Sequence, residues 1–143
     1  MRPALDHVHV WVRDRAAAAA WYARVLHLRP AETFAAWADG GPLFLQTPAG
    51  DPALALFEGE SARGADHTVA FRVSAEDFRA FVAALPTLDL RDRTGAAVTA
   101  GSIVDHGLAV SLYFTDPEGN RLELTCYDVA ALGDLLDRPG RAP

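Results

Sequence analysis

The sequence predicts an α+β fold built from two similar halves, each with a strand, a helix and then two or three further strands. Three observations lead to this prediction. A shift of 60 residues lays one strand-helix segment over another, the stretch 109–126 alternates like a hairpin, and Gly and Pro clusters separate the remaining apolar runs. A chain of 143 residues suffices for one domain, or for two small halves that share a core.

The stretch 109–126, AVSLYFTDPEGNRLELTC, predicts two strands joined by a turn. In the turn DPEGN, Pro presets φ and Gly accepts a left-handed conformation. Side chains alternate between the faces of a strand, so Leu112 and Leu124 face a core while Tyr113 and Glu123 face the opposite way. A Glu on a strand face is more often simply exposed to solvent, so the hairpin alone defines no site.

The first half opens with LDHVHVWV, in which an all-valine face predicts a core and turns His7, His9 and Trp11 to the other face. The 60-residue shift aligns His7 with His67 and Trp11 with Phe71, and an Asp precedes both aligned histidines. Aromatic residues match as well as alanines, which indicates an internal duplication. Two histidines at equivalent positions of a repeat are expected to share one structural role.

Each half also contains a predicted helix. Asp14 is expected to cap the first, over residues 15–27, and Ser74 the second, which Pro86 should end. Residues 87–105 are expected to form one short strand and a loop, which is either a lid over a site or an ordinary surface connection. Further strands are expected over 32–37, 43–47 and 53–58, a last helix over 128–136, and a frayed tail from 138.

Composition excludes several functions. The net charge is −6 and no basic cluster occurs, which argues against nucleic-acid partners. All 13 basic residues are Arg, so Schiff-base chemistry and a P-loop lysine are excluded. No apolar run approaches the roughly 20 residues that cross a bilayer and no signal peptide is evident, so we expect a cytoplasmic protein without a membrane partner. Cys126 is in phase with the apolar face of its strand and is expected to be buried.

The repeat also indicates a metal site. Leu122-Glu123-Leu124 corresponds in pattern to the segment around position 55, so a symmetric site would use His7, position 55, His67 and Glu123. Position 55 is Ala, which leaves two imidazoles and one carboxylate. This set leaves coordination positions open and commonly holds Fe(II), with Mn, Co, Ni or Zn as possible alternatives.

These motifs resemble the vicinal oxygen chelate superfamily, which includes glyoxalase I, extradiol dioxygenases, fosfomycin-modifying enzymes and bleomycin resistance proteins. The segments LDHVHVWV, ADHTVAFRVSAEDF and YFTDPEGNRLEL carry the resemblance. It implies two βαβββ modules that form an open, cup-shaped barrel, often as a homodimer. It also implies metal binding by His7, His67 and Glu123, and an active-site role for Tyr113. The modules are then expected over residues 1–60 and 61–127, with a C-terminal helix and tail over 128–143.

Departures from the superfamily patterns narrow the expected chemistry. Ala55 stands where glyoxalase I has a fourth ligand, and His9 stands where fosfomycin enzymes have Thr. The further active-site His of extradiol enzymes is missing from residues 52–55, and the Lys of fosfomycin enzymes is absent from the chain. The run before the Tyr113 strand, which contains His106, resembles that of small extradiol enzymes, in which a nearby His assists acid-base chemistry.

We therefore expect a metal-dependent enzyme nearest to an extradiol-type dioxygenase, an oxidoreductase that acts on a small catechol-like substrate. Tyr113 would donate a hydrogen bond to a bound oxyanion, and His9 or His106 would shuttle a proton. The alternatives are a metal-dependent thiol transferase, lyase or isomerase, and a non-catalytic drug-binding resistance protein. Residues expected to line the pocket, each of which could instead be ordinary packing, are Trp11, Gln46, Phe57 and Phe71.

Overall fold

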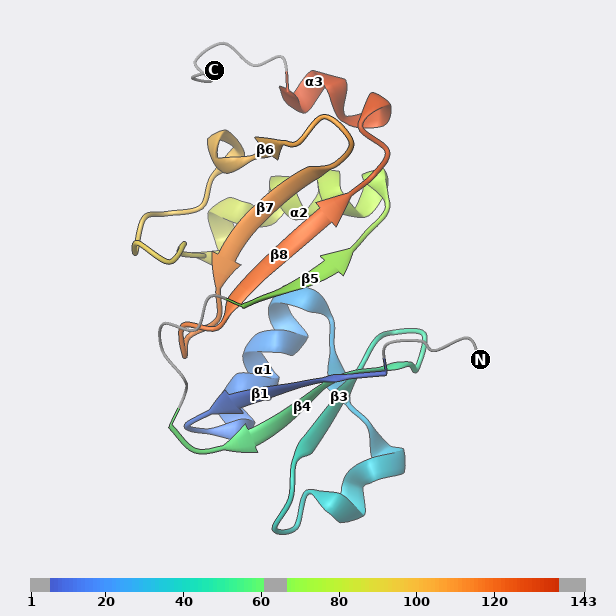
Figure 1. Ribbon diagram of the computed structural model, residues 1–143, viewed down its shortest axis with the longest axis vertical. Helices are drawn as coiled ribbons and strands as arrows, with labels where there is room; N and C mark the ends of the chain where they lie inside the picture. The colour runs from blue at the N-terminus through green and yellow to red at the C-terminus, as the bar shows by residue number, and fades with distance from the viewer. Residues whose placement is uncertain (1–5, 61–66, 137–143) are drawn as a thin grey trace. The chain divides into compact units, whose positions relative to one another are not determined.

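The structure is a computed structural model that describes residues 6–60 and 67–136. Its elements follow the order βαβββ twice, which confirms the expected α+β class with a repeated βαβββ order (Figure 1). The chain divides into two compact units. The first comprises Met1–Ala65 with the turn Asp116–Asn120, and the second comprises Asp66–Thr115 with Arg121–Pro143.

The first unit contains a four-stranded sheet with the strand order β1-β4-β3-β2. β1 runs parallel to β4, whereas β3 pairs antiparallel with both β4 and β2. The valines of β1 are buried with the leucines of β4, and helix α1 contributes Tyr22 and Val25 to the core. The elements are β1 (Val8–Val12), α1 (Arg15–Leu26), β2 (Arg29–Pro30), the 3₁₀ helix η1 (Glu32–Trp37), β3 (Leu43–Gln46) and β4 (Pro52–Glu58).

The second unit repeats this arrangement with the strand order β5-β8-β7-β6. β5 runs parallel to β8, and β7 pairs antiparallel with β8 and β6. Phe78, Val82 and Leu85 of helix α2 are buried, as is Cys126. The elements are β5 (Thr68–Arg72), α2 (Ala75–Leu88), η2 (Ala100–Ser102), β6 (Val104–Asp105), β7 (Val110–Thr115), β8 (Arg121–Cys126), η3 (Ala130–Leu132) and α3 (Gly133–Leu136).

Both predicted helix caps are present. The Asp14 carboxylate accepts a hydrogen bond from the Ala17 N–H at 2.9 Å, and the Ser74 hydroxyl accepts one from the Asp77 N–H at 3.1 Å. The prediction that Pro86 ends the second helix is wrong, because α2 continues to Leu88. Pro86 lies so close to the end that few backbone hydrogen bonds remain to be disturbed, while the buried stripe of the helix still packs in the core.

The prediction of a strand over residues 32–37 is also wrong, because the 3₁₀ helix η1 occupies this segment. Phe34 and Trp37 are three positions apart, so one turn of a 3₁₀ helix brings them to the same side. Their rings stack with centroids 5.0 Å apart, and both rings contact Phe44 of β3. Packing of these aromatic rings therefore decides the local conformation, which the weak alternation of ETFAAW did not reveal.

The connection after α2 is more ordered than its sequence pattern indicates. Arg91 and Ala97 form an isolated bridge around a tight turn, and β6 is the one short strand expected there. The expected last helix is split into η3 and α3. The predicted strand start at residue 5, the Asp at 66 in the repeat and the tail from 138 lie outside the described residues.

A buried carboxylate organises the turn between β7 and β8. Asp116 is only 3% exposed, and its Oδ2 accepts hydrogen bonds from the Tyr22 hydroxyl at 2.9 Å and the Asn120 amide group at 2.7 Å. Its Oδ1 accepts from the backbone N–H groups of Glu118 and Asn120. Burial raises the pKa of Asp116, and the hydrogen bonds oppose this shift because they stabilise the charged form.

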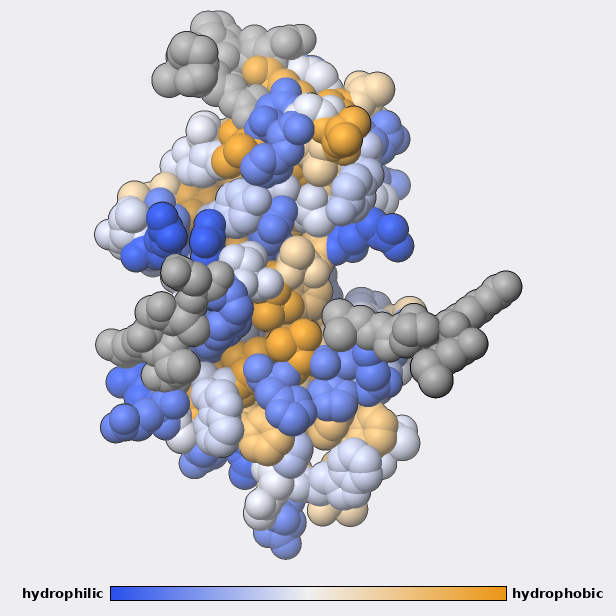
Figure 2. Space-filling model, viewed as in Figure 1, coloured by the Kyte–Doolittle hydropathy of each residue, from blue (hydrophilic) through white to orange (hydrophobic). Residues whose placement is uncertain are grey.

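No helix within residues 6–60 and 67–136 is long and apolar enough to cross a membrane. Hydrophilic and hydrophobic residues are mixed on the face drawn in Figure 2. The large hydrophobic side chains that remain exposed include Trp11, Trp37, Leu108 and Tyr127.

We expect Tyr22→Phe to lower the free energy of unfolding by about 1–2 kcal/mol, because Asp116 loses a buried hydrogen-bond donor. Urea unfolding followed by circular dichroism measures this change. Tyr127→Phe is the matched control, since Tyr127 is 64% exposed, and it should alter stability by less than about 0.5 kcal/mol. Equal stabilities for the two variants would contradict the role given to the Tyr22–Asp116 hydrogen bond.

Candidate functional site

The β7–β8 hairpin presents a polar layer on one face of the second unit's sheet. Tyr113 pairs directly with Glu123, and Ser111 pairs with Thr125. The fully buried Ser111 hydroxyl lies 2.7 Å from Glu123 Oε1 and 3.1 Å from Thr125 Oγ1. Ser111 thus holds one oxygen of the Glu123 carboxylate, and the Tyr113 side chain also interacts with this carboxylate.

Tyr113 is also connected to His106, which follows β6. The Tyr113 hydroxyl lies 3.1 Å from His106 Nε2, and the two rings meet edge to face. Partial burial raises the pKa of Tyr113, and the neighbouring negative charge of Glu123 raises it further. A tyrosine with its ordinary pKa is already protonated at neutral pH, and the raised pKa extends this range, so the phenol can act as a hydrogen-bond donor.

We expect Glu123→Gln to lower the pKa of Tyr113, because the substitution removes a negative charge that disfavours the phenolate. NMR titration of the tyrosine Cζ resonances measures this pKa, and Tyr113→Phe assigns the resonance. Glu76→Gln is the matched control, because this substitution removes the same charge from an exposed position in the first turn of α2. A Tyr113 pKa that is unchanged by Glu123→Gln would contradict the proximity of the two groups.

An aromatic layer covers one face of the first unit's sheet. His9 pairs with the fully buried Ala55, and Phe44 pairs with Ala55 from the other side. The His9 ring lies 4.7 Å from Phe57, and the Trp11 ring lies 5.3 Å from Phe57 (centroid distances). Because the small Ala55 side chain lies between these strands, larger rings from β1, β3 and β4 surround it.

His7 belongs to this same face and has a defined orientation. Its Nδ1 lies 2.6 Å from the Asp6 carboxylate, and its Nε2 lies 3.3 Å from Nε2 of His9. The ring also packs edge to face against Phe44. A carboxylate on one ring nitrogen fixes the tautomer of an imidazole, as it does in many metal-binding histidines, and the other nitrogen of His7 faces His9.

The register of β5 changes the alignment of the repeat. Val10 pairs with the buried Leu56, and Phe71, 61 residues later, pairs with the buried Leu124. Likewise His9 pairs with Ala55, and Ala70 pairs with Glu123. The strands therefore correspond with a shift of 61 residues, although the helix caps keep a shift of 60. The expected shift is wrong for the strands.

This register makes Thr68 the strand counterpart of His7 and places Thr68 on the face of Glu123. Phe71 lies on the opposite face, so the structure does not bring it to the polar layer. His67 is exposed and comes directly before β5. Since His67 lies outside the paired residues, the alternation of the strand does not fix the direction of its ring.

The remaining predicted residues lie in the first unit. Trp11 and Phe57 join the aromatic layer, and Trp11 is 46% exposed. Gln46 ends β3 beside a register irregularity and is half-buried. Among residues 6–60 and 67–136, no group of three or more His, Cys, Asp or Glu side chains is arranged to hold a metal ion. The donors individually suit a divalent metal, since Asp6 orients His7 and Ser111 orients Glu123.

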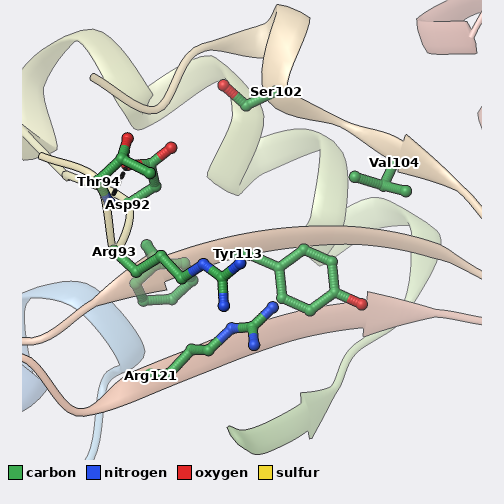
Figure 3. A pocket seen from close by; sticks show the side chains of 8 residues that line it. Asp92, Arg93, Thr94, Ser102, Val104, Tyr113 and Arg121 are labelled. Carbon is green, nitrogen blue, oxygen red and sulfur yellow. Dashed lines mark hydrogen bonds between the residues drawn. The ribbon is translucent and has the colours of Figure 1, made fainter. Parts of the chain in front are cut away.

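A cavity of about 350 Å³ lies beside Tyr113 in the second unit (Figure 3). The sequence reasoning did not find it, because Arg93 comes from a loop without a recognisable motif and Arg121 had no assigned role. The role of Ser111 was also missed, although its phase with Tyr113 was a usable signal. The residues that line the cavity are Asp92, Arg93, Thr94, Ser102, Val104, Tyr113, Phe114 and Arg121.

Residues 4–124 match the Glyoxalase/Bleomycin resistance protein/Dioxygenase superfamily. The chain belongs to this superfamily. The match spans both βαβββ modules and confirms the family expected from the sequence motifs. No curated protein matches the sequence.

Solved structures share the fold of this superfamily member. Oxidase ChaP-H1 is 22% identical with a TM-score of 0.65, over 87% of this chain and 96% of that one. A glyoxalase/dioxygenase from Nostoc punctiforme is 22% identical with a TM-score of 0.62, over 85% and 89%. A mutant of the fosfomycin resistance protein FosX from Listeria monocytogenes, complexed with Mn(II) and 1S,2S-dihydroxypropylphosphonic acid, is 17% identical with a TM-score of 0.57, over 92% and 98%.

Proposed function

We propose that this protein is a divalent-metal-dependent enzyme of the vicinal oxygen chelate type, nearest to an extradiol-type dioxygenase, which acts on a small catechol-like substrate. The observation that carries this proposal is the contact of Tyr113 with His106 and its pairing with Glu123. A protonated phenol, an imidazole and a carboxylate are the groups needed to bind a hydroxylated substrate and move one of its protons. Membership of the superfamily supports the proposal.

We assign metal binding to His7, His67 and Glu123, with Fe(II) as the preferred ion and Mn, Ni, Co or Zn as alternatives. The orientation of His7 by Asp6 and of Glu123 by Ser111 supports this assignment. A divalent ion bound there would lower the pKa of a substrate hydroxyl and stabilise negative charge on its oxygen. The Mn(II) bound to the related FosX protein is in keeping with a divalent ion in this fold.

The residues of the chain itself have distinct roles in this proposal. The Tyr113 hydroxyl donates a hydrogen bond to the substrate oxygen, and His106 accepts or returns the proton that moves through this contact. His9 is the second proton-transfer candidate, and Trp11 and Phe57 pack against the substrate ring with Gln46 at the edge. We also propose that the enzyme works in the cytoplasm as a homodimer, the common assembly in its superfamily.

We expect His67→Ala and Glu123→Gln each to remove most of the bound metal, because each variant loses one of the proposed ligands. Elemental analysis after anaerobic purification measures the metal content. Thr68→Ala is the matched control, because Thr68 neighbours His67 and should leave the metal bound. Full metal content in His67→Ala would contradict the ligand assignment. Loss of metal in Thr68→Ala would in addition favour the face defined by the β5 register.

We expect Tyr113→Phe to reduce kcat for oxygen-dependent cleavage of a catechol by about 10²-fold, because the phenol no longer donates to the substrate oxygen. Oxygen uptake by the Fe(II)-loaded protein measures the rate, and Tyr127→Phe should leave it unchanged. His106→Ala should reduce the rate and alter its pH dependence. Absence of oxygen uptake with every catechol, alongside thiol-dependent turnover with another metal, would overturn the dioxygenase proposal.

The exposed rings of the first unit favour one other function. Trp11 is 46% exposed and lies against Phe57, so a flat aromatic compound could stack there without any reaction. This arrangement favours a drug-sequestering protein as the second candidate. Tight binding of an aromatic compound by protein that contains no metal and shows no turnover would select this candidate over the enzyme.

A further inference from the structure

We propose that the cavity beside Tyr113 binds a negatively charged group of the substrate, a carboxylate or a phosphonate, through Arg93 and Arg121. This inference adds a substrate class to the proposed function. It rests on the proposed function only for the reaction that the bound substrate undergoes. The binding itself can be measured without turnover. The substrate would then be a small hydroxylated compound that carries one anionic group.

The two arginines reach the cavity from separate parts of the second unit. Arg121 is the first residue of β8, and Arg93 belongs to the loop between α2 and η2. Figure 3 shows both guanidinium groups extending toward the space in front of the Tyr113 ring. Neither guanidinium forms an ion pair with a carboxylate within the described part of the chain.

The loop that carries Arg93 is held in place by its own hydrogen bonds. The Asp92 N–H donates to the Ala96 carbonyl at 2.9 Å, and Gly95 closes the turn with a φ of 84°, a conformation that favours glycine. Thr115 of β7 donates to the Arg91 carbonyl through its N–H at 2.8 Å. The position of the Arg93 backbone is therefore defined relative to β7.

Asp92 also lines the cavity, but its charge is already used within the loop. Its Oδ1 accepts hydrogen bonds from the Thr94 N–H, the Thr94 hydroxyl and the Ala96 N–H. The hydrogen bond from the Thr94 hydroxyl is the main reason that the pKa of Asp92 is lowered, so this carboxylate is ionised at neutral pH. The cavity therefore has two positive charges, from Arg93 and Arg121, and one negative charge, from the hydrogen-bonded Asp92, so its net charge is positive.

This positive charge contrasts with the protein as a whole, whose net charge is −6. A general affinity for anions is therefore not expected, and a local pair of arginines is the feature that would attract one. Guanidinium groups suit carboxylate and phosphonate oxygens because their N–H groups form paired, charge-assisted hydrogen bonds. Ser102, whose hydroxyl oxygen accepts from the Thr99 N–H, can offer its own proton to the same anion.

The position of Arg121 links the anion to the proposed chemistry. Its guanidinium carbon lies 5.3 Å from the centre of the Tyr113 ring, which is a favourable cation–π distance. The same tyrosine meets His106 through its hydroxyl. A substrate with its anionic group at Arg93 and Arg121 would thus lie along the Tyr113 ring and reach the hydroxyl with its reactive oxygen.

The test is isothermal titration calorimetry on the full chain with three matched catechols. Protocatechuate carries a carboxylate, its phosphonate analogue carries the second type of anion, and protocatechuamide is the neutral control. We expect at least one anionic compound to bind about tenfold or more tightly than the amide. Arg93→Gln and Arg121→Gln should each remove this preference, and raised salt should weaken it.

Arg91→Gln is the matched control, because Arg91 lies in the same loop, pairs with Asp89 and does not line the cavity. This variant should keep the preference for the anion. Equal affinity for the amide and both anions, or an equal loss in Arg91→Gln, would overturn the proposal. Because Arg93 is exposed, its substitution is not expected to impair folding, and circular dichroism checks this.

The outcomes separate this inference from the proposed function. A preference for the anion that depends on Arg93, in a protein without oxygen uptake, would retain the anion site and reject the dioxygenase. The protein could instead take up oxygen with uncharged catechols, unaffected by Arg93→Gln, and bind the amide and the anions equally. This result would retain the dioxygenase and reject the anion site. The carboxylate and phosphonate arms identify which anion the site prefers.

Discussion

The buried carboxylate of Asp116 is the constraint on which the candidate site depends. Its hydrogen bonds with Tyr22, Glu118 and Asn120 define the turn between β7 and β8. In a hairpin the turn sets the register of the two strands, and a slip of one residue would send every side chain to the opposite face. The polar layer of the second unit therefore exists because this turn has one geometry.

The same hairpin supplies both a core and a candidate active face. Leu112, Leu122 and Leu124 are buried on one side, which stabilises the sheet. The other side carries Tyr113 and Glu123, which are both half-buried. Partial burial raises the pKa of Tyr113, so the packing of the sheet strengthens the preference of this side chain for its protonated, hydrogen-bond-donating form.

The two units share one element order but differ in the size and charge of the side chains on their sheets. Ala55 in β4 allows aromatic rings to pack together, whereas Glu123 in β8 takes a buried serine as its partner. The result is an aromatic face in the first unit and a charged, hydroxyl-rich face in the second. Each unit therefore offers its own kind of contact, ring stacking in the first and hydrogen bonding in the second.

The sequence by itself determined the strand-helix-strand order of each half, both helix caps and the shared polar face of Tyr113 and Glu123, because these follow from local periodicity and turn chemistry. Only the tertiary structure decided which face of β5 is buried. Val69 and Phe71 pair with the core leucines of β8, whereas the match of identical residues in the sequence aligns His67 with His7. The tertiary structure also decided the cavity at Arg93, because contacts between a loop and a distant strand leave no periodic signal in the sequence.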